Sequence, residues 1–368
     1  MPEQSFLAVG LMSGTSMDGI DAAIIETDGE TVSWRGPSLT HPYDDDFRRD
    51  LRAALGHDPL IRVPENDLIG RLTERHAEAV KAVLAEAGKT PDQVRVVGFH
   101  GHTVLHRPDM GVTRQIGDSA RLAELTGIDV VGDMRLNDVA AGGEGAPLAP
   151  VYHRALAAGL EKPLAVLNLG GVGNVTWIGS GETPGDLLAF DTGPGNALLD
   201  DWMMEKTGQA MDRDGALAAE GTVDRLSLSM LMDNAYFDMP PPKSLDRDDF
   251  GMAPVTGLSA ANGAATLAAF TVASVARAAQ FFPAPAKRWL ITGGGRCNPV
   301  IMEGLRKALE CPVEAVEAAG WQGDALEAQA FAFLAVRALN GLALSYPGTT
   351  GVGEPLSGGR LYPVTQTA

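Results

Sequence analysis

The 368-residue sequence has few cysteines and few positive charges. Its two cysteines, Cys297 and Cys311, are spaced unlike any metal motif and are too few for a disulfide framework in a chain of this length. A reducing compartment is the simplest expectation for such a chain. Lysine and arginine number 29 against 47 aspartates and glutamates, which gives a formal net charge of −18. Because nucleic acids and anionic membranes bind basic surfaces, we expect neither as a partner.

We expect neither a signal peptide nor a membrane-spanning segment in this sequence. Its first residues, MPEQSF, contain neither a basic nor an apolar segment. The longest charge-free apolar stretch, Gly263–Ala276, is shorter than the about 20 residues that span a bilayer, so we predict a buried helix there. Hydrophobic residues still make up 45% of the chain, enough for a sizeable core. We expect a soluble, cytoplasmic protein.

Hydrophobic periodicity predicts an α/β fold. Apolar and β-branched runs predict strands at Phe6–Met12, Ile20–Glu26, Val94–Phe99, Ile128–Gly132, Leu164–Leu169, Val175–Ile178, Leu187–Phe190 and Trp289–Ile291. Apolar residues at three- and four-residue spacing predict helices at Pro64–Ala87, Asp118–Thr126, Pro150–Ala158, Gly195–Thr207, Gly263–Ala279, Pro299–Leu309 and Asp324–Leu339. Helices separate the later strands, which is the α/β pattern.

Two segments far apart in the sequence share one pattern. Phe6–Ile25 and Leu164–Ile178 each contain an apolar strand, a turn of small residues and a returning apolar strand. The repetition predicts two lobes, 1–148 and 149–344, separated by a stretch rich in glycine and proline. The glycine-rich tail 345–368 either folds back on the first lobe or is mobile. Chance similarity between two glycine hairpins explains the pattern equally well at this point.

The turn after the first strand has the composition of an anion-binding loop. No Gly-Lys-Ser/Thr triplet ends it and a strand follows it, so it is not a Walker P-loop. Gly14 and Gly19 allow positive φ, successive N–H groups can form a nest for phosphate oxygens, and Thr15 and Ser16 add hydroxyls. Asp18 would repel phosphate unless a divalent cation lay between them. The alternative is an ordinary hairpin with Asp18 as a turn residue.

Three further glycine turns follow predicted strands. FDTGPGN, Phe190–Asn196, places Asp191 at a strand end before a helix whose N-terminus can attract phosphate. In the alternative reading, Asp191 caps its own turn and Asn196 caps the helix. LNLGGVGN, Leu167–Asn174, and WLITGGGRCN, Trp289–Asn298, end in similar turns. Each turn is weak evidence alone, but four at strand ends together indicate a phosphate-binding protein.

These motifs resemble those of the anhydro-N-acetylmuramic acid kinase family, within the acetate kinase, sugar kinase, heat-shock-70 and actin superfamily. The resemblance runs nearly end to end and depends on the segments GLMSGTSMDGID, GFHGHTVLH, QIGD, DMRLNDVAAGGEGAPLAP, LNLGGVGNVT, FDTGPGN, TGGGRCN and DALEAQAFAFLA. It implies two RNase-H-like lobes with the active site in the interlobe cleft. The first lobe would carry the phosphate hairpin, and the second the catalytic Asp191 and an adenosine-side glycine turn.

The resemblance also implies a reaction. ATP would phosphorylate O6 of 1,6-anhydro-N-acetylmuramic acid while water opens the anhydro bridge at C1, giving N-acetylmuramic acid 6-phosphate and ADP, a step of cell-wall recycling and amino-sugar catabolism. The catalytic residues would be the base Asp191 and the acidic Glu327. The ATP site would comprise Gly14, Thr15, Ser16, Met17, Asp18, Gly19, Ile20, Asp21, Gly170, Gly171, Asn174, Gly193, Gly195, Asn196, Gly293 and Gly294. His100, Asp133 and Glu144 would meet the sugar, Mg²⁺ would accompany ATP with Asp18 as its candidate ligand, and a homodimer is suggested by family resemblance only.

Such a reaction fits a site with one firmly placed carboxylate. Water attacks a glycosidic carbon with the help of a carboxylate base, while the γ-phosphoryl group traps the leaving O6 and replaces a general acid. A positioned base contributes about 10²–10⁴ in rate. The alternatives are a kinase for another sugar on the same fold, which would add no solvent oxygen to C1, and a nucleotide-switched binding protein of the actin or chaperone kind.

The histidines of HGHTVLH suggest a metal site less strongly than a hydrogen-bonding role. His102 and His106 have the spacing of a helical metal pair, but their neighbours favour a strand, where that spacing does not converge. His102 stands where the family usually has glutamine. Nearby, Arg135 and Asp138 form either a sugar contact or a surface pair of little energy, and Lys243 is as readily solvated as functional.

Overall fold

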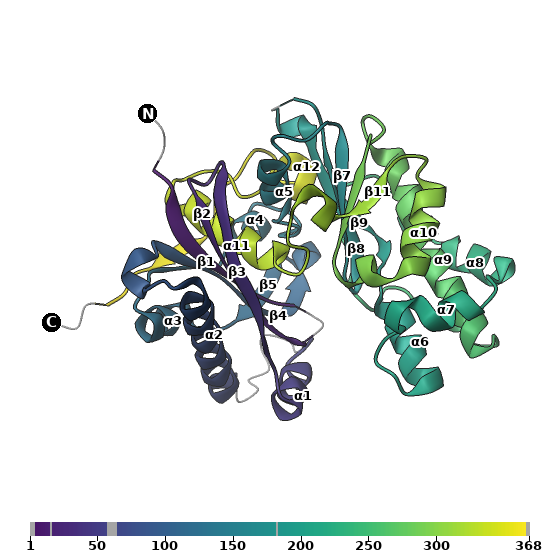
Figure 1. Cartoon of the computed structure of the whole chain (residues 1–368), viewed down its shortest axis with the longest axis horizontal. Coiled ribbons are helices and arrows are strands. Elements are labelled where there is room, and N and C mark those ends of the chain that lie inside the picture. Colours follow the sequence, from purple (N-terminus) through teal and green to yellow (C-terminus); the bar gives the residue numbers. More distant parts are fainter. Residues whose placement is uncertain (1–3, 15–16, 57–64, 182, 366–368) are drawn as a thin grey trace. The chain divides into compact units, whose positions relative to one another are not determined.

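A computed structural model of the chain describes residues 4–14, 17–56, 65–181 and 183–365. It divides into two compact units, unit 1 (Met1–Gly159 with Ala325–Ala368) and unit 2 (Leu160–Asp324) (Figure 1). These limits differ from the predicted boundaries at 148/149 and 344/345. The reason is helix α11 (Leu326–Leu339), which packs against the strands of unit 1, as the chain after it also does.

The sheet of unit 1 has a mixed arrangement of strands. Its order is β12 (Arg360–Tyr362), β6 (Val130–Gly132), β4 (Val96–Arg107), β1 (Phe6–Ser13), β2 (Gly19–Thr27) and β3 (Val32–Pro42), with β5 (Val112–Ile116) paired to β4. Strands β1, β2 and β3 are antiparallel neighbours, whereas β4 is parallel to β1 and β6 is parallel to β4. Antiparallel pairing of β12 with β6 attaches the C-terminal segment to this unit.

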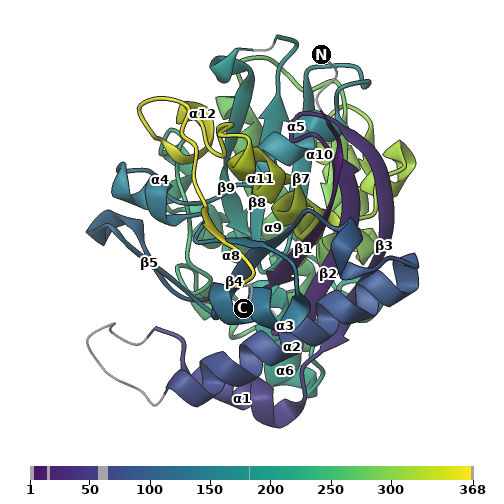
Figure 2. The same ribbon diagram turned by 90° about the vertical axis from the view of Figure 1, so that its left-hand side faces the viewer.

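Helices cover both faces of this sheet. Helices α2 (Glu65–Ala87) and α3 (Ser119–Thr126) lie side by side over one face, and α11 lies over the other (Figures 1 and 2). Alternate residues of a strand face opposite sides. Accordingly Val9 belongs to the core beneath α2, whereas Gly10 lies against α11, where an added Cβ would be 1.8 Å from the Ala328 carbonyl oxygen. Shorter helices complete the unit: α1 (Asp45–Ala53), α4 (Leu136–Ala140), α5 (Pro150–Leu156) and α12 (Pro347–Thr350).

The sheet of unit 2 repeats the topology of unit 1. Its order is β11 (Val313–Ala315), β10 (Trp289–Thr292), β7 (Leu164–Leu169), β8 (Val172–Ile178) and β9 (Leu187–Pro194). Strands β7, β8 and β9 are antiparallel neighbours, whereas β10 is parallel to β7 and β11 is parallel to β10. The same sequence of pairings occurs in unit 1, where β1, β2 and β3 are antiparallel neighbours and β4 and β6 run parallel to β1. The repeated hairpin pattern in the sequence is therefore a repeated fold, and the prediction of an α/β protein with two RNase-H-like lobes is confirmed.

The helices of unit 2 enclose a separate core. They are α6 (Ala197–Thr207), α7 (Ala216–Glu220), α8 (Arg225–Met232), α9 (Ala260–Ala278) and α10 (Pro299–Ala308), and the core includes Trp202, Phe270 and Trp289. Among the described residues, Ala260–Phe281 is the one helical stretch long and apolar enough to cross a membrane by length and composition. More than half of it is buried inside the unit, which fits the predicted core helix.

Short 3-10 helices connect these elements. They are η1 (Pro91–Gln93), η2 (Pro108–Met110), η3 (Pro184–Asp186), η4 (Arg213–Gly215), η5 (Ala235–Asp238), η6 (Ala253–Val255), η7 (Ala279–Phe281), η8 (Gly294–Cys297) and η9 (Val316–Ala319).

Candidate active site

The predicted phosphate turn joins β1 to β2 in unit 1. Its Met17 adopts a left-handed conformation (φ 57°), and the Met17 N–H donates to the Gly14 carbonyl oxygen over 3.1 Å. Gly19 is required for close approach rather than for the predicted positive φ, because a Cβ there would lie 2.4 Å from the His41 carbonyl oxygen. Two predicted ATP-binding residues, Thr15 and Ser16, lie outside the described residues.

The side chains after the turn have different surroundings. Asp18 is exposed, whereas Ile20 is fully buried in the core and can offer a ligand only its backbone. The Asp21 carboxylate accepts a hydrogen bond of 2.6 Å from the Thr40 hydroxyl. In the described part of the chain, no three His, Cys, Asp or Glu side chains gather as a metal cluster. Asp18 thus remains a lone candidate, suited to a cation that arrives with phosphate oxygens as its other ligands.

In unit 2, the predicted glycine turns after β7 and β9 are bonded to each other. The Gly195 N–H donates to the Gly171 carbonyl oxygen (2.9 Å), and the Asn196 N–H donates to the Gly170 carbonyl oxygen (2.8 Å). The Asn196 side-chain amide donates to the Leu169 and Gly170 carbonyl oxygens. Asn196 therefore ties the two turns together and makes no side-chain cap on α6, contrary to the alternative reading.

The turn after β10 joins the same group. Gly293 has φ +76°, and a Cβ there would lie 2.4 Å from the Asn168 side-chain oxygen, so only glycine fits. Gly294 is more open: the nearest atom to an added Cβ is the Asn196 amide nitrogen at 3.7 Å. Three chain segments thus present closely spaced backbone at one end of the sheet, the kind of surface that nucleotides approach.

Asp191 is held at three points inside unit 2. It lies on β9 opposite Asn174, three residues before the strand ends at Pro194, so the strand is longer than predicted. Its N–H donates to the Lys243 carbonyl oxygen (3.1 Å), its carbonyl oxygen accepts from the Tyr236 hydroxyl (2.6 Å), and its Oδ2 accepts from the Leu245 N–H (2.9 Å). The chain at 236–245 therefore holds the residue, and the Leu245 N–H fixes its carboxylate.

Lys243 belongs to the segment that holds Asp191. The sequence left undecided whether Lys243 is solvated or functional. Its side chain is buried, its Nζ donates to the Tyr236 carbonyl oxygen (2.9 Å), and it lies 4.4 Å from the Tyr236 ring centroid and 4.6 Å from that of Phe281. Burial lowers the pKa of the Lys243 ammonium to about 8. The proline-rich segment before Lys243 signalled a rigid loop but not a buried cation.

In unit 1, the predicted sugar-binding histidine contacts an arginine. The Arg135 Nε and Nη2 atoms lie 3.1 and 2.9 Å from His100 Nε2, and Arg135 Nη1 donates to the Gly145 carbonyl oxygen (2.7 Å). The other imidazole nitrogen, Nδ1, lies 2.9 Å from the Gly101 carbonyl oxygen, so it carries the proton and Nε2 accepts from the guanidinium. Burial and then the Arg135 charge hold the pKa of His100 well below its usual value, so this histidine is neutral.

Arg135 is a partly buried cation in this cluster. Burial lowers its pKa to about 10, against the opposing charges of Glu327 and Asp138, so it remains charged at neutral pH. Asp138 is buried and not part of a surface pair: its carboxylate accepts from the Gly145 N–H and the Thr350 hydroxyl, both at 2.6 Å.

The remaining predicted residues lie around this cluster. Glu144 precedes Gly145, and its N–H donates to the Thr350 carbonyl oxygen (2.7 Å). Glu327 is in the first turn of α11. Asp133 is exposed with its carboxylate bonded to the Tyr362 hydroxyl, and it lines one small cavity together with His100 and Arg135. His100 and Asp133 thus line one cavity with Arg135, whose role the sequence left undecided, and Glu144 precedes the glycine whose carbonyl oxygen Arg135 bonds.

The other two histidines of this motif, His102 and His106, form hydrogen bonds within unit 1. His102 lies on β4, fully buried, with Nδ1 2.9 Å from the Ser13 hydroxyl. His106, also on β4, has Nδ1 2.9 Å from the Thr113 hydroxyl. Burial lowers the pKa of each to about 4. Both therefore make hydrogen bonds as neutral imidazoles, in agreement with the hydrogen-bonding reading.

Comparison with known proteins identifies the family. The family described as anhydro-N-acetylmuramic acid kinase matches residues 6–364. Proteins of that name from Rhodospirillum rubrum and Paramagnetospirillum magneticum are 59% and 58% identical, each over 357 residues, covering 97% and 96% of this chain and 94% and 99% of their own. A solved glucokinase of the ROK family from Streptomyces griseus is far more distant, at 16% identity and a TM-score of 0.39 over 89% of this chain and 99% of its own. The chain belongs to the anhydro-N-acetylmuramic acid kinase family.

Proposed function

We propose that this chain uses ATP and water to convert 1,6-anhydro-N-acetylmuramic acid into N-acetylmuramic acid 6-phosphate and ADP. The observation that carries the proposal is the placement of Asp191 on β9, where two backbone hydrogen bonds hold the residue and the Leu245 N–H bonds its carboxylate, in the unit that also gathers the glycine turns. The reaction would serve cell-wall recycling and amino-sugar catabolism. Its need for ATP agrees with the cytoplasmic location expected from the sequence.

Asp191 is the proposed general base. Its Oδ2 accepts a hydrogen bond from the Leu245 N–H, which fixes the direction of the carboxylate. It would take a proton from a water molecule that attacks C1, so that the C1–O6 bond breaks as O6 bonds to the γ-phosphorus. The bond between the γ-phosphorus and the bridging oxygen of ADP breaks in the same transfer, and ADP leaves with that electron pair. The proton ends on Asp191, and the bridge electrons end in the new O6–P bond. Glu327 would be the acidic partner on the sugar side.

The nucleotide would be held mainly by backbone. The bonded turns at Gly170–Gly171 and Gly195–Asn196, together with Gly293–Gly294, support the adenosine and phosphate positions in unit 2. In unit 1, the β1–β2 turn is the proposed phosphate loop. Backbone donors suit this protein because its formal net charge is −18, so phosphate attraction must be local.

Magnesium would arrive with the nucleotide. The described residues contain no three-ligand cluster, and a nucleotide-bound Mg²⁺ needs only one or two protein carboxylates, so exposed Asp18 fits that requirement. When bound, Mg²⁺ would neutralise charge on the phosphates.

Arg135 is the proposed partner of the substrate's lactyl carboxylate. It is a charged guanidinium at the cavity that His100 and Asp133 also line, and neutral His100 holds it by accepting two of its N–H groups. A guanidinium recognises carboxylates through paired hydrogen bonds. This geometry favours an acidic amino sugar over a neutral hexose, which distinguishes the proposal from a kinase for another sugar.

The test is turnover by the purified chain with ATP and the anhydro sugar. We expect one ADP and one 6-phosphorylated sugar per turnover, and no ATP consumption without sugar. The Asp191→Asn variant should lose at least about 10²-fold in kcat with nucleotide affinity retained, because a positioned base contributes about 10²–10⁴. Slow, sugar-independent ATP hydrolysis would instead indicate a nucleotide-switched protein, and near-normal activity of Asp191→Asn would remove Asp191 as the base.

A further inference from the structure

The segment Tyr43–Arg48 forms hydrogen bonds with both sides of the turn between β1 and β2. On the side of β1, the Ser13 hydroxyl lies 2.8 Å from the Tyr43 hydroxyl. On the side of β2, the Tyr43 N–H donates to the Asp18 carbonyl oxygen (3.0 Å), and Arg48 Nε donates to the Met17 carbonyl oxygen (3.0 Å). Tyr43 precedes α1 and Arg48 lies within it. The segment therefore fixes the turn from outside the hairpin.

Arg48 is the basic residue among those that bond the turn. Its guanidinium also donates to the Tyr43 carbonyl oxygen (3.4 Å) and pairs with Asp45 (3.3 Å). One planar side chain thus connects the turn, Tyr43 and the first turn of α1. A planar fork with several donors can hold several acceptors in fixed relation, which a lysine ammonium cannot do as well.

The bond from Arg48 fixes the direction of a backbone donor. In a trans peptide, the carbonyl oxygen and the following N–H point in opposite directions. Because the Met17 carbonyl oxygen is directed at Arg48, the Asp18 N–H points away from Arg48. The left-handed conformation of Met17, uncommon for a side chain other than glycine, is part of the same arrangement.

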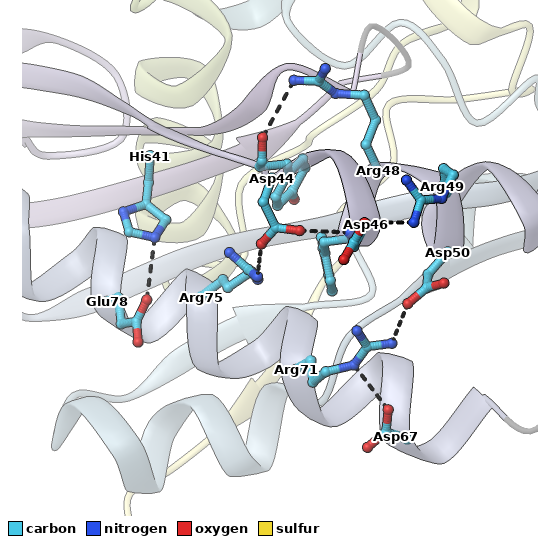
Figure 3. A network of polar contacts seen from close by, with 12 residues as sticks. His41, Asp44, Asp46, Arg48, Arg49, Asp50, Asp67, Arg71, Arg75 and Glu78 are labelled. Carbon is cyan, nitrogen blue, oxygen red and sulfur yellow. Dashed lines mark hydrogen bonds and ion pairs between the residues drawn. The ribbon is translucent and has the colours of Figure 1, made fainter.

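The segment Tyr43–Arg48 is itself held against α2 (Figure 3). Asp44 caps α1 through the Phe47 N–H and pairs with Arg75. The Phe47 ring is fully buried, 4.5 Å from the Arg75 guanidinium carbon. Figure 3 also shows Asp50 of α1 paired with Arg71 of α2. Exposed ion pairs are individually weak, so the buried Phe47 ring provides most of the anchoring.

We propose that Arg48 is a positioning residue for nucleotide binding. It holds the Met17–Asp18 peptide so that its N–H faces the phosphate, although Arg48 itself makes no bond to the ligand. This inference depends on the proposed function, because it requires the β1–β2 turn to bind nucleotide phosphate.

The chain supplies a matched control in the neighbouring residue. Arg49 is also on α1, pairs with Asp46 as Arg48 pairs with Asp45, and has 71% of its side chain exposed. Among the bonds described for Arg49, none reaches the turn. Arg48→Gln and Arg49→Gln therefore remove the same charge from the same helix but differ in their connection to the turn.

The experiment measures the dissociation constant for ADP and the steady-state constants of the full chain. For Arg48→Gln we expect ADP binding about ten-fold weaker and an ATP KM raised by a similar factor, as loss of one charge-assisted hydrogen bond implies. The kcat at saturating ATP and the sugar KM should stay within about two-fold of wild type, because positioning acts on nucleotide binding. Arg48→Lys should recover part of the loss, and Arg49→Gln should bind ADP like the wild type.

Two outcomes separate this inference from the proposed function. If the wild type binds ADP and Arg48→Gln binds it equally well, the positioning role is overturned while the kinase proposal stands. If the wild type binds no ADP, the proposed function itself fails. An equal loss in Arg48→Gln and Arg49→Gln would indicate an effect of charge alone and would also overturn the inference.

Discussion

The contact between β1 and α11 predicts a large loss of stability when Gly10 becomes alanine. A Cβ at Gly10 would lie 1.8 Å from the Ala328 carbonyl oxygen and 2.5 Å from the Ala332 nitrogen, both on the backbone of α11. Ordinary contact begins at 3.4 Å, so the helix would have to move by about 1.6 Å. Backbone cannot rotate away as a flexible side chain can.

The magnitude follows from this displacement. Overpacking a core costs about 1–3 kcal/mol, and a rigid backbone clash belongs at the upper end. We therefore expect Gly10→Ala to lower the free energy of unfolding of unit 1 by about 3 kcal/mol. For a domain of about 150–250 residues this is a fall of roughly 6–12 °C in Tm. Activity should fall as well, because Glu327 adjoins Ala328 on the displaced helix.

The assay is urea and thermal unfolding followed by circular dichroism. Gly70→Ala is the matched control: it lies in α2 with no atom within 4 Å of an added Cβ, so it should stabilise the chain by about 0.5–1 kcal/mol. If Gly10→Ala unfolded within about 0.5 kcal/mol of the wild type, the packing of α11 against β1 would be refuted.

Three further predictions concern the site and the buried histidines. Gly294→Ala should keep the fold, because the nearest atom to its Cβ is 3.7 Å away, yet weaken ADP binding in calorimetry by crowding the backbone surface; unchanged affinity would count against this turn. Arg135→Lys should raise the sugar KM about ten-fold with the ATP KM unchanged, because the paired hydrogen bonds to a carboxylate are lost, and an unchanged sugar KM would count against this role. His76 and His102 have their pKa values lowered to about 4 by burial, so the unfolded chain binds more protons between pH 6.5 and 4. Stability should be complete above pH 6.5 and fall by about 3 kcal/mol per histidine by pH 4, a loss that acid titration of unfolding would detect and that replacement of His102 by glutamine should reduce.

The sequence predicted the buried strands well because they are continuous apolar runs. The first strand was predicted at Phe6–Met12 and is Phe6–Ser13 in the structure. Strand β3 was missed because it is a partly exposed edge strand whose alternation is interrupted by Gly36 and Pro37. Helix α1 was also missed, although Asp44 before the apolar pair Phe47 and Leu51 was a readable start signal.

The candidate site was predictable in its motifs but not in its supports. Asp191 and each glycine turn lie within short motifs that can be read directly from the sequence. The groups that hold them come from distant segments: Leu245 bonds Asp191 from 54 residues away, and Arg48 bonds Met17 from 31 residues away. Arg135 became identifiable only through its hydrogen bonds to His100, 35 residues earlier. Such pairings depend on topology, which single-sequence patterns do not encode.

Turnover in water enriched with heavy oxygen tests the central claim most directly. The wild-type chain would be incubated with ATP and 1,6-anhydro-N-acetylmuramic acid, and the product analysed by mass as soon as it forms, before C1 exchanges with solvent. The account predicts one heavy oxygen on C1 and an unlabelled phosphate on O6. A phosphorylated sugar that retains its anhydro bridge, or solvent label in the phosphate instead of on C1, would contradict it.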